Sequence, residues 1–244
     1  MQRYFIELAY NGTEYFGWQR QPNDISVQQV VEEALSKLNS NKEVKVVGCG
    51  RTDTGVHAHQ FILHVDLPSI EHPEKYMYKL NSMLPESIAI FKIKEVEHEA
   101  HARFHATSRT YRYFIHRMKN PFKQDQSWHL IQALDVEKMN EAAKLMIGSK
   151  DFTSFSKVNT DTKTNICVVT KAEWIVESDT EIYFEITADR FLRNMVRATV
   201  GTLVDVGVGK LEPADISAIL EAKDRGEAST SVPAHGLFLW KVDY

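Results

Sequence analysis

The sequence is poor in cysteine and has no long hydrophobic run. Its only two cysteines, Cys49 and Cys167, are too few for a disulfide framework, and no residues show the spacing of a zinc knuckle. No apolar stretch is long enough to span a bilayer, and the N-terminal segment 1–7, MQRYFIE, meets a charge too soon for a signal peptide. These absences favour a protein of the cytoplasm over an exported or membrane-inserted one.

An excess of positive charge is also lacking, because the formal net charge is -4. Phosphate is attracted by a local patch rather than by the total, however, and residues 100–124 contain no acidic residue. This stretch interleaves cations with aromatic rings, namely Arg103, Arg109, Arg112, Arg117, Lys119 and Lys123 with Phe104, Tyr111, Tyr113, Phe114 and Phe122. Such a mixture binds unpaired bases and their phosphates. A solvated basic strand above core aromatics explains the same pattern equally well.

One glycine-rich stretch, 48–59, presents reactive groups. It reads GCGRTDTGVHAH and joins an apolar run ending at Val47 to an alternating run that begins at Phe61, so we expect a loop between two strands. Its three glycines permit backbone conformations that side chains forbid, and they leave the Asp53 carboxylate two residues from the Arg51 guanidinium. For so short a motif, a turn with an exposed ion pair is the plain alternative.

The first half of the chain predicts alternating strands and helices. Ser26 and Gln29 form a capping box ahead of apolar residues at helical spacing, and Pro73 begins a second helix. Alternating apolar residues predict four strands, which are 4–10, a run ending at Val47, a run through Val65, and 88–96. The order β-α-β-β-α-β is the split ferredoxin-like arrangement, in which two helices cover one sheet face.

The second half repeats this rhythm loosely, and we place a soft boundary near residue 100. The predicted subdomains are 1–100, which carries the glycine-rich loop, and 101–244. The expected elements of the second are a strand at 109–117, a helix from Asp135 stopped by Gly148, a hairpin of 168–175 and 181–188, a helix from Arg190 with Arg193 and Arg197 along one edge, a helix from Pro213, and a closing strand at 237–242.

Five blocks in this order resemble the TruA family of tRNA pseudouridine synthases: GTEYFGWQ at 12–19, GRTDTGVHA at 50–58, RTYRY at 109–113, FLRNMVR at 191–197 and PAHGL at 233–237. The resemblance covers nearly the whole chain. It implies an α+β pseudouridine synthase fold, with two ferredoxin-like (RRM-like) halves sharing a central antiparallel sheet and a cleft between them. It also implies a cofactor-free isomerase, a homodimer, that converts uridines 38, 39 and 40 of the tRNA anticodon stem-loop.

The resemblance assigns roles to particular residues. Asp53 matches the catalytic aspartate, and Arg197 its cationic partner. Tyr111 matches the tyrosine that stacks on the flipped target uracil; Tyr113, on the same strand face, is the rival for that role. Arg51 matches the arginine that displaces the target nucleotide, and its position also suits a counter-ion to Asp53. Whether the aspartate adds to C6, attacks C1' or assists the loss of uracil stays open.

Further arginines are predicted to bind the RNA, and two other functions compete with isomerisation. The RNA-binding set is Arg51, Tyr111, Arg109, Arg112, Arg117 and Arg193. A catalytically silent RNA-binding module would use the same surface but would not need a carboxylate facing phosphate. A metal-assisted hydrolase centred on Asp53, His57 and His59 would need a coherent ligand set, and none is evident, so we expect no metal. We expect His57 to hold the loop instead.

Overall fold

The computed structural model describes residues 1–157 and 162–244. It is a mixed α+β fold whose described residues form ten mostly antiparallel strands and five α-helices. Two compact units make up the chain, residues 1–107 with 238–244, and residues 108–237. The predicted boundary at residue 100 placed the C-terminal strand with the second half, whereas its residues from Phe238 onward belong to the first unit. No helix among the described residues is long and apolar enough to cross a membrane.

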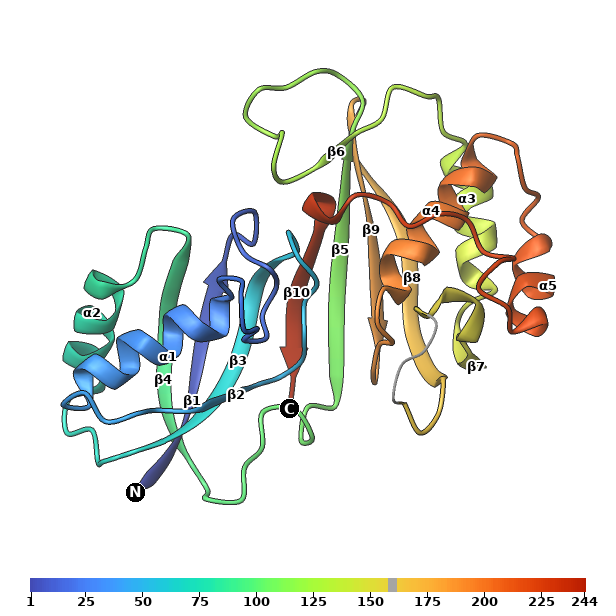
Figure 1. Cartoon of the computed structure of the whole chain (residues 1–244). Coiled ribbons are helices and arrows are strands. Elements are labelled where there is room, and N and C mark those ends of the chain that lie inside the picture. Colours follow the sequence, from blue (N-terminus) through green and yellow to red (C-terminus); the bar gives the residue numbers. More distant parts are fainter. Residues whose placement is uncertain (158–161) are drawn as a thin grey trace. The chain divides into compact units, whose positions relative to one another are not determined.

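The first unit follows the predicted order of strands and helices. Its elements are β1 (Gln2–Tyr10), α1 (Val27–Leu38), β2 (Val46–Gly48), β3 (His57–Leu67), α2 (Pro73–Met83), β4 (Ile88–Val96) and β10 (Leu237–Asp243). The strands lie in the order β4-β1-β3, and β2 and β10 both pair with β3, β10 in parallel and the others antiparallel. Figure 1 shows α1 and α2 together on one face of these strands.

Apolar periodicity explains this unit. Alternate residues of β1 and β3, such as Ile6, Leu8 and Leu63, are fully buried together with Val31 and Leu35 of α1. The predicted cap of α1 is confirmed, because the Ser26 hydroxyl accepts a hydrogen bond from the Gln29 N–H at 3.3 Å. Pro73 begins α2 as expected. The hydrophobic pattern therefore sets the layers from which the loops emerge.

A buried histidine lies on the sheet face away from the helices. His64 of β3 is 6% exposed, and its Nδ1 accepts the Ala102 N–H at 3.1 Å. Its ring centroid is 4.6 Å from that of His101. Burial lowers the pKa of the His64 imidazole to about 4, and the nearby His101 and Arg3 add to this while Asp66 opposes it. The folded chain therefore holds this imidazole neutral.

The second unit contains the remaining strands and helices. They are β5 (Ser108–His116), β6 (Trp128–His129), α3 (Val136–Lys144), β7 (Gly148–Asp151), β8 (Ile166–Ser178), β9 (Glu181–Ala188), α4 (Met195–Gly207) and α5 (Asp215–Ala222), with short 3-10 turns at Thr153–Phe155 and Ala234–Gly236. The strand order is β5-β9-β8-β7, all antiparallel, and β6 pairs in parallel with β5. The predicted hairpin and the cap of α3 by Asp135 are confirmed.

Two predicted helix ends in this unit are wrong. The helix expected from Arg190 begins only at Met195, because Asn194 has a left-handed backbone with φ 67°. Arg190 and Arg193 precede it, so they do not share a helical edge with Arg197. The helix expected to stop at Gly148 ends at Lys144 and is capped by Leu145; Gly148, with φ 103°, begins β7 instead. A left-handed backbone, which apolar periodicity does not report, therefore sets the start of α4.

Candidate active site

Asp53 lies in the loop between β2 and β3, and the backbone beside it is firmly bound. The Tyr10 hydroxyl hydrogen-bonds the Thr52 hydroxyl at 2.8 Å, and the Trp18 N–H donates to the Thr52 carbonyl at 3.2 Å. The Val56 N–H donates to the Asp53 carbonyl at 3.1 Å. Thr52 is buried, Asp53 is half-buried and Arg51 is exposed. The loop therefore fixes its own backbone while it leaves the two charged side chains accessible.

A second loop, 12–19, holds the first one by close backbone contact. The Gly12 N–H donates to His57 Nδ1 at 3.0 Å, and the Gly55 N–H donates to the Tyr15 carbonyl at 3.2 Å. A Cβ at Gly12 would lie 2.0 Å from the Val56 carbonyl oxygen, so the two chains meet where no side chain fits. Gly17 is equally constrained, because its φ is +80° and a Cβ would lie 2.3 Å from the Thr52 oxygen.

The histidines of the loop make structural contacts. His57 is 1% exposed, and its ring stacks on Phe238 with centroids 4.5 Å apart, in addition to its bond with Gly12. His59 is exposed and stacks on Trp240 at 4.1 Å. Within residues 1–157 and 162–244, no group of three or more His, Cys, Asp or Glu side chains could hold a metal ion. The hydrolase interpretation therefore has no ligand set in the described part of the chain.

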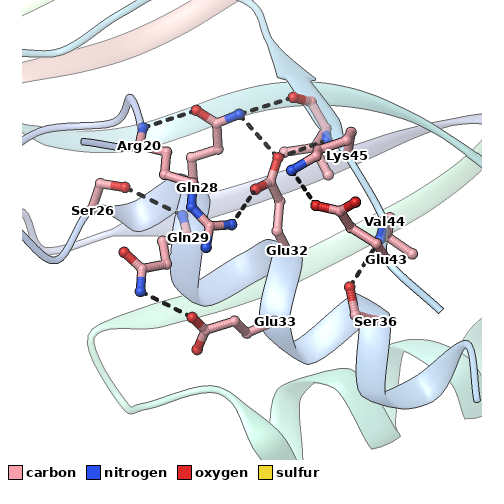
Figure 2. A network of polar contacts seen from close by, with 11 residues as sticks. Arg20, Ser26, Gln28, Gln29, Glu32, Glu33, Ser36, Glu43, Val44 and Lys45 are labelled. Atoms are coloured by element: carbon pink, nitrogen blue, oxygen red, sulfur yellow. Dashed lines mark hydrogen bonds and ion pairs between the residues drawn. The ribbon is translucent and has the colours of Figure 1, made fainter. Parts of the chain in front are cut away.

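A buried carboxylate on α1 anchors the strand that leads into the loop (Figure 2). Glu32 is 3% exposed and accepts hydrogen bonds from the Val46 N–H at 3.1 Å, Gln28 Nε2 at 3.0 Å and Arg20 Nη1 at 3.2 Å. Gln28 Nε2 also donates to the Val46 carbonyl at 3.1 Å. Both backbone groups of Val46 are thus bound by α1 side chains, immediately before the glycine-rich loop. The sequence interpretation missed this cluster, although an acidic residue directly after the apolar Val31 was its signal.

The same cluster reaches the second loop. The Arg20 N–H donates to Gln28 Oε1 at 3.0 Å, and the Gln28 N–H donates to the Trp18 carbonyl at 2.9 Å. The Trp18 ring in turn stacks on Phe61 of β3 with centroids 4.0 Å apart. Helix α1, the 12–19 loop and the Asp53 loop therefore form one bonded assembly within the first unit.

The two candidate stacking tyrosines, both on β5, have different environments. Tyr111 is half-buried, and its ring meets Phe191 edge-on with centroids 4.9 Å apart. Tyr113 is fully buried; its hydroxyl donates to the Pro233 carbonyl at 2.9 Å, and its ring is 2.7 Å from where a Cβ on Gly236 would lie. Burial raises the pKa of Tyr113. Tyr113 is a core residue, which leaves Tyr111 as the accessible ring.

Arg197 lies in the first turn of α4 and is half-buried. Its Nε donates to the Val232 carbonyl at 2.7 Å, and the Val232 N–H donates back to the Arg197 carbonyl at 3.3 Å. This pair of bonds ties the helix start to the segment before β10 and fixes the direction of the guanidinium. Arg197 and Tyr111 belong to the second unit, whereas Asp53 and Arg51 belong to the first.

The predicted RNA-binding arginines of the second unit differ in their contacts. Arg193 is exposed, Arg117 is half-buried, and Arg109 donates to the Asp189 carbonyl at 2.9 Å. Arg112 instead forms an ion pair with Glu185 at 2.5 Å and lies 4.7 Å from the centroid of the Tyr183 ring.

Glu185 explains why Arg112 is held in this way. Its side chain is 12% exposed, and Lys171 binds it from the other side at 2.8 Å. Burial alone would raise the pKa of Glu185, but hydrogen bonds from Lys171 and Arg112 lower it below its ordinary value. The carboxylate is therefore charged at neutral pH, and Arg112 is part of its charge balance.

A model of the tRNA pseudouridine synthase family matches residues 8–105 and 142–244, which include the Asp53 loop, the 12–19 loop and the start of α4. The chain belongs to the tRNA pseudouridine synthase family. The sequence of the chain is 52% identical over 247 residues to a tRNA pseudouridine synthase A of Porphyromonas gingivalis, and the match covers 100% of this chain and 98% of that one. It is 40% identical over 240 residues to a protein of the same name from Bacillus subtilis, covering 97% of each. The resemblance that the five sequence blocks indicated is confirmed.

Proposed function

We propose that the chain isomerises uridine to pseudouridine in tRNA, at uridines 38, 39 and 40 of the anticodon stem-loop, with Asp53 as the nucleophile. The observation that carries this proposal is the arrangement around Asp53. A carboxylate that remains accessible extends from a backbone bound on both sides, in a chain of the pseudouridine synthase family. A nucleophile needs this combination of a fixed position and an open approach.

The reaction balances without a cofactor. The bond between N1 and C1' breaks, the freed uracil turns, and a bond forms between C5 and C1'. C5 loses its proton and N1 gains one, so the product is an isomer of the substrate and no oxidant or reductant is required. The chain must therefore supply a carboxylate, a cation that keeps the carboxylate charged under the base, and a surface for the displaced base.

Arg197 supplies the cation, and Tyr111 supplies the surface for the displaced base. The Nε bond of Arg197 to Val232 orients its guanidinium, which we assign as the partner of Asp53. Extruding a nucleotide costs a few kcal/mol, while stacking on an aromatic ring returns about 1–3 kcal/mol per base. Tyr111, the accessible tyrosine of β5, is the ring that offsets this cost. Exposed Arg51 fills the space that the target nucleotide leaves.

We also propose that the chain has two ferredoxin-like halves and forms a homodimer. The strand order β4-β1-β3-β2 of the first unit supports a ferredoxin-like half, and we propose a second such half in the other unit with the active-site cleft between them. A homodimer in the cytoplasm binds the anticodon stem-loop in this proposal. The competing function, a silent RNA-binding module, gives no reason for an accessible carboxylate in a surface meant for phosphate.

Pseudouridine mapping tests the proposal. Purified chain is incubated with an unmodified tRNA transcript, and pseudouridine is located by a base-specific chemical adduct. Wild type should modify uridines 38–40, and Asp53→Asn, which keeps the shape but not the charge, should modify none. Binding of tRNA without product by the wild type would support the silent module instead.

A further inference from the structure

Residues 117–127 form the loop between β5 and β6 (Figure 1). This loop carries an almost completely exposed aromatic ring. Phe122 is 91% exposed. Single exposed apolar residues are ordinary on protein surfaces, so this exposure alone points to no ligand. The sequence of the loop, however, contains only one acidic residue, Asp125, and three cations, which are Arg117, Lys119 and Lys123. An exposed ring among cations suits a nucleic acid better than it suits a protein core.

The root of the loop is anchored to the sheet of the second unit. The Arg117 N–H donates to the Thr180 carbonyl at 2.8 Å, and His116 Nδ1 hydrogen-bonds the Ser127 hydroxyl at 3.0 Å. The Lys123 ammonium forms an ion pair with Glu181, the first residue of β9. The first two contacts fix the ends of the loop, and the Lys123 ion pair ties its middle to β9.

The tip is a bonded turn that holds the ring outward. Asn120 Oδ1 accepts the Phe122 N–H at 2.9 Å, and the Asn120 carbonyl accepts the Lys123 N–H at 3.3 Å. Pro121, between them, has a restricted φ. A ring on such a turn loses little conformational freedom when a ligand stacks on it, which favours binding.

Resting on the proposed function, we propose that Phe122 stacks on an unpaired base of the tRNA substrate away from the target uridine, and that Lys119 contacts a neighbouring phosphate. A strand rises about 3.3 Å per residue, so β5 places Arg117 about 20 Å from Tyr111. We assign the two rings to different nucleotides, because Tyr111 lies within β5 and Phe122 lies in the loop that follows this strand. The loop lies outside both ranges matched by the family model, 8–105 and 142–244.

Fluorescence anisotropy with an unmodified tRNA transcript tests this contact across a series of salt concentrations. Phe122→Ala should raise Kd about 5- to 150-fold without changing the salt dependence, because a stacking surface is lost and no charge is removed. Phe122→Trp keeps a stacking ring and should bind like wild type. Lys119→Gln should reduce the slope of log Kd against log salt by about 0.7–0.9. The control is Ile131→Ala, whose apolar side chain is 72% exposed outside the loop and should not affect binding.

Several results would overturn the inference. An unchanged Kd for Phe122→Ala is one, and an equal loss for Phe122→Trp is another. A changed oligomeric state of Phe122→Ala in sedimentation would assign the ring to a protein contact. Loss of folding does not confuse the test, because so exposed a ring contributes little to the core. Failure of the proposed function is distinguishable: wild type would form no pseudouridine, while a Kd that depends on Phe122 would still support the tRNA contact.

Discussion

Replacing Glu32 by glutamine tests whether α1 holds the strand that enters the Asp53 loop. Glu32 accepts hydrogen bonds from Val46, Gln28 and Arg20 in a buried position (Figure 2). The neighbouring Glu33 is exposed and accepts one hydrogen bond, from Gln29 at 2.9 Å. Glu33→Gln makes the same chemical change on the same helix and is therefore the matched control.

The expected loss follows from the bonds. The glutamine oxygen can still accept from Val46 and Gln28, which share Oε1 of the carboxylate, but its amide group then faces Arg20 Nη1, another donor, where Oε2 accepted. Hydrogen bonds to charged groups contribute about 1.5–3 kcal/mol, so we expect Glu32→Gln to lower the free energy of unfolding of the first unit by about 2 kcal/mol. A substitution on the exposed face costs at most about 0.5 kcal/mol, which is the expectation for Glu33→Gln.

Two measurements check this prediction. In urea, with tryptophan fluorescence as the probe, the midpoint should fall clearly for Glu32→Gln and remain close to wild type for Glu33→Gln, with an unchanged slope. Hydrogen exchange of the Val46 amide, which donates directly to Glu32, should accelerate by about 30-fold only in the first variant. Equal midpoints and equal Val46 exchange in the two variants would refute the anchoring argument.

Three further predictions concern the loop contacts, the buried histidine and the RNA cations. Gly12→Ala should destabilise the chain by about 1–3 kcal/mol because its Cβ would meet the Val56 carbonyl, whereas Gly50→Ala, with no atom within 4 Å of its Cβ, should cost far less in the same urea titration. Because the pKa of His64 falls to about 4 on folding, only the unfolded chain gains this proton as pH falls below about 6.5, so stability should decrease from pH 7 to pH 5, and less so in His64→Gln. Replacing the exposed Arg193 by glutamine should reduce the slope of log Kd for tRNA against log salt concentration by about 0.7–0.9. Arg112→Gln should chiefly lower the stability of the fold, because Arg112 balances the charge of Glu185.

Local signals predicted the first unit well. Ser26 and Pro73 begin their helices because capping and a fixed φ act within a few residues, and the alternation of β1 and β3 reports directly which face is buried. The helix expected from Arg190 was wrong because a left-handed Asn194 interrupts a pattern whose apolar spacing continues unchanged across it. Apolar periodicity shows which residues are buried, but it does not show where the backbone leaves the helical conformation.

Contacts between distant segments account for what the sequence could not show. The motif at 12–19 and the motif around Asp53 could be read separately, but only the structure shows that Gly12 and Gly17 are needed where the two loops touch. Glu32 escaped notice because a glutamate on a helix is usually solvated, and its burial depends on the position of Val46. Tyr111 and Tyr113 are two residues apart and so lie on the same face of β5. Tyr113 alone is fully buried, because Pro233 and Gly236 pack against it.

We propose that Asp53 performs the chemistry and is not required for tRNA binding. The most direct measurement compares Asp53→Asn with wild type in one experiment, under single-turnover conditions with tRNA saturated by protein, and records both Kd and the rate of pseudouridine formation. We expect Asp53→Asn to bind tRNA with a Kd close to that of wild type and to form no detectable product. Pseudouridine formation by Asp53→Asn at the wild-type rate would contradict it.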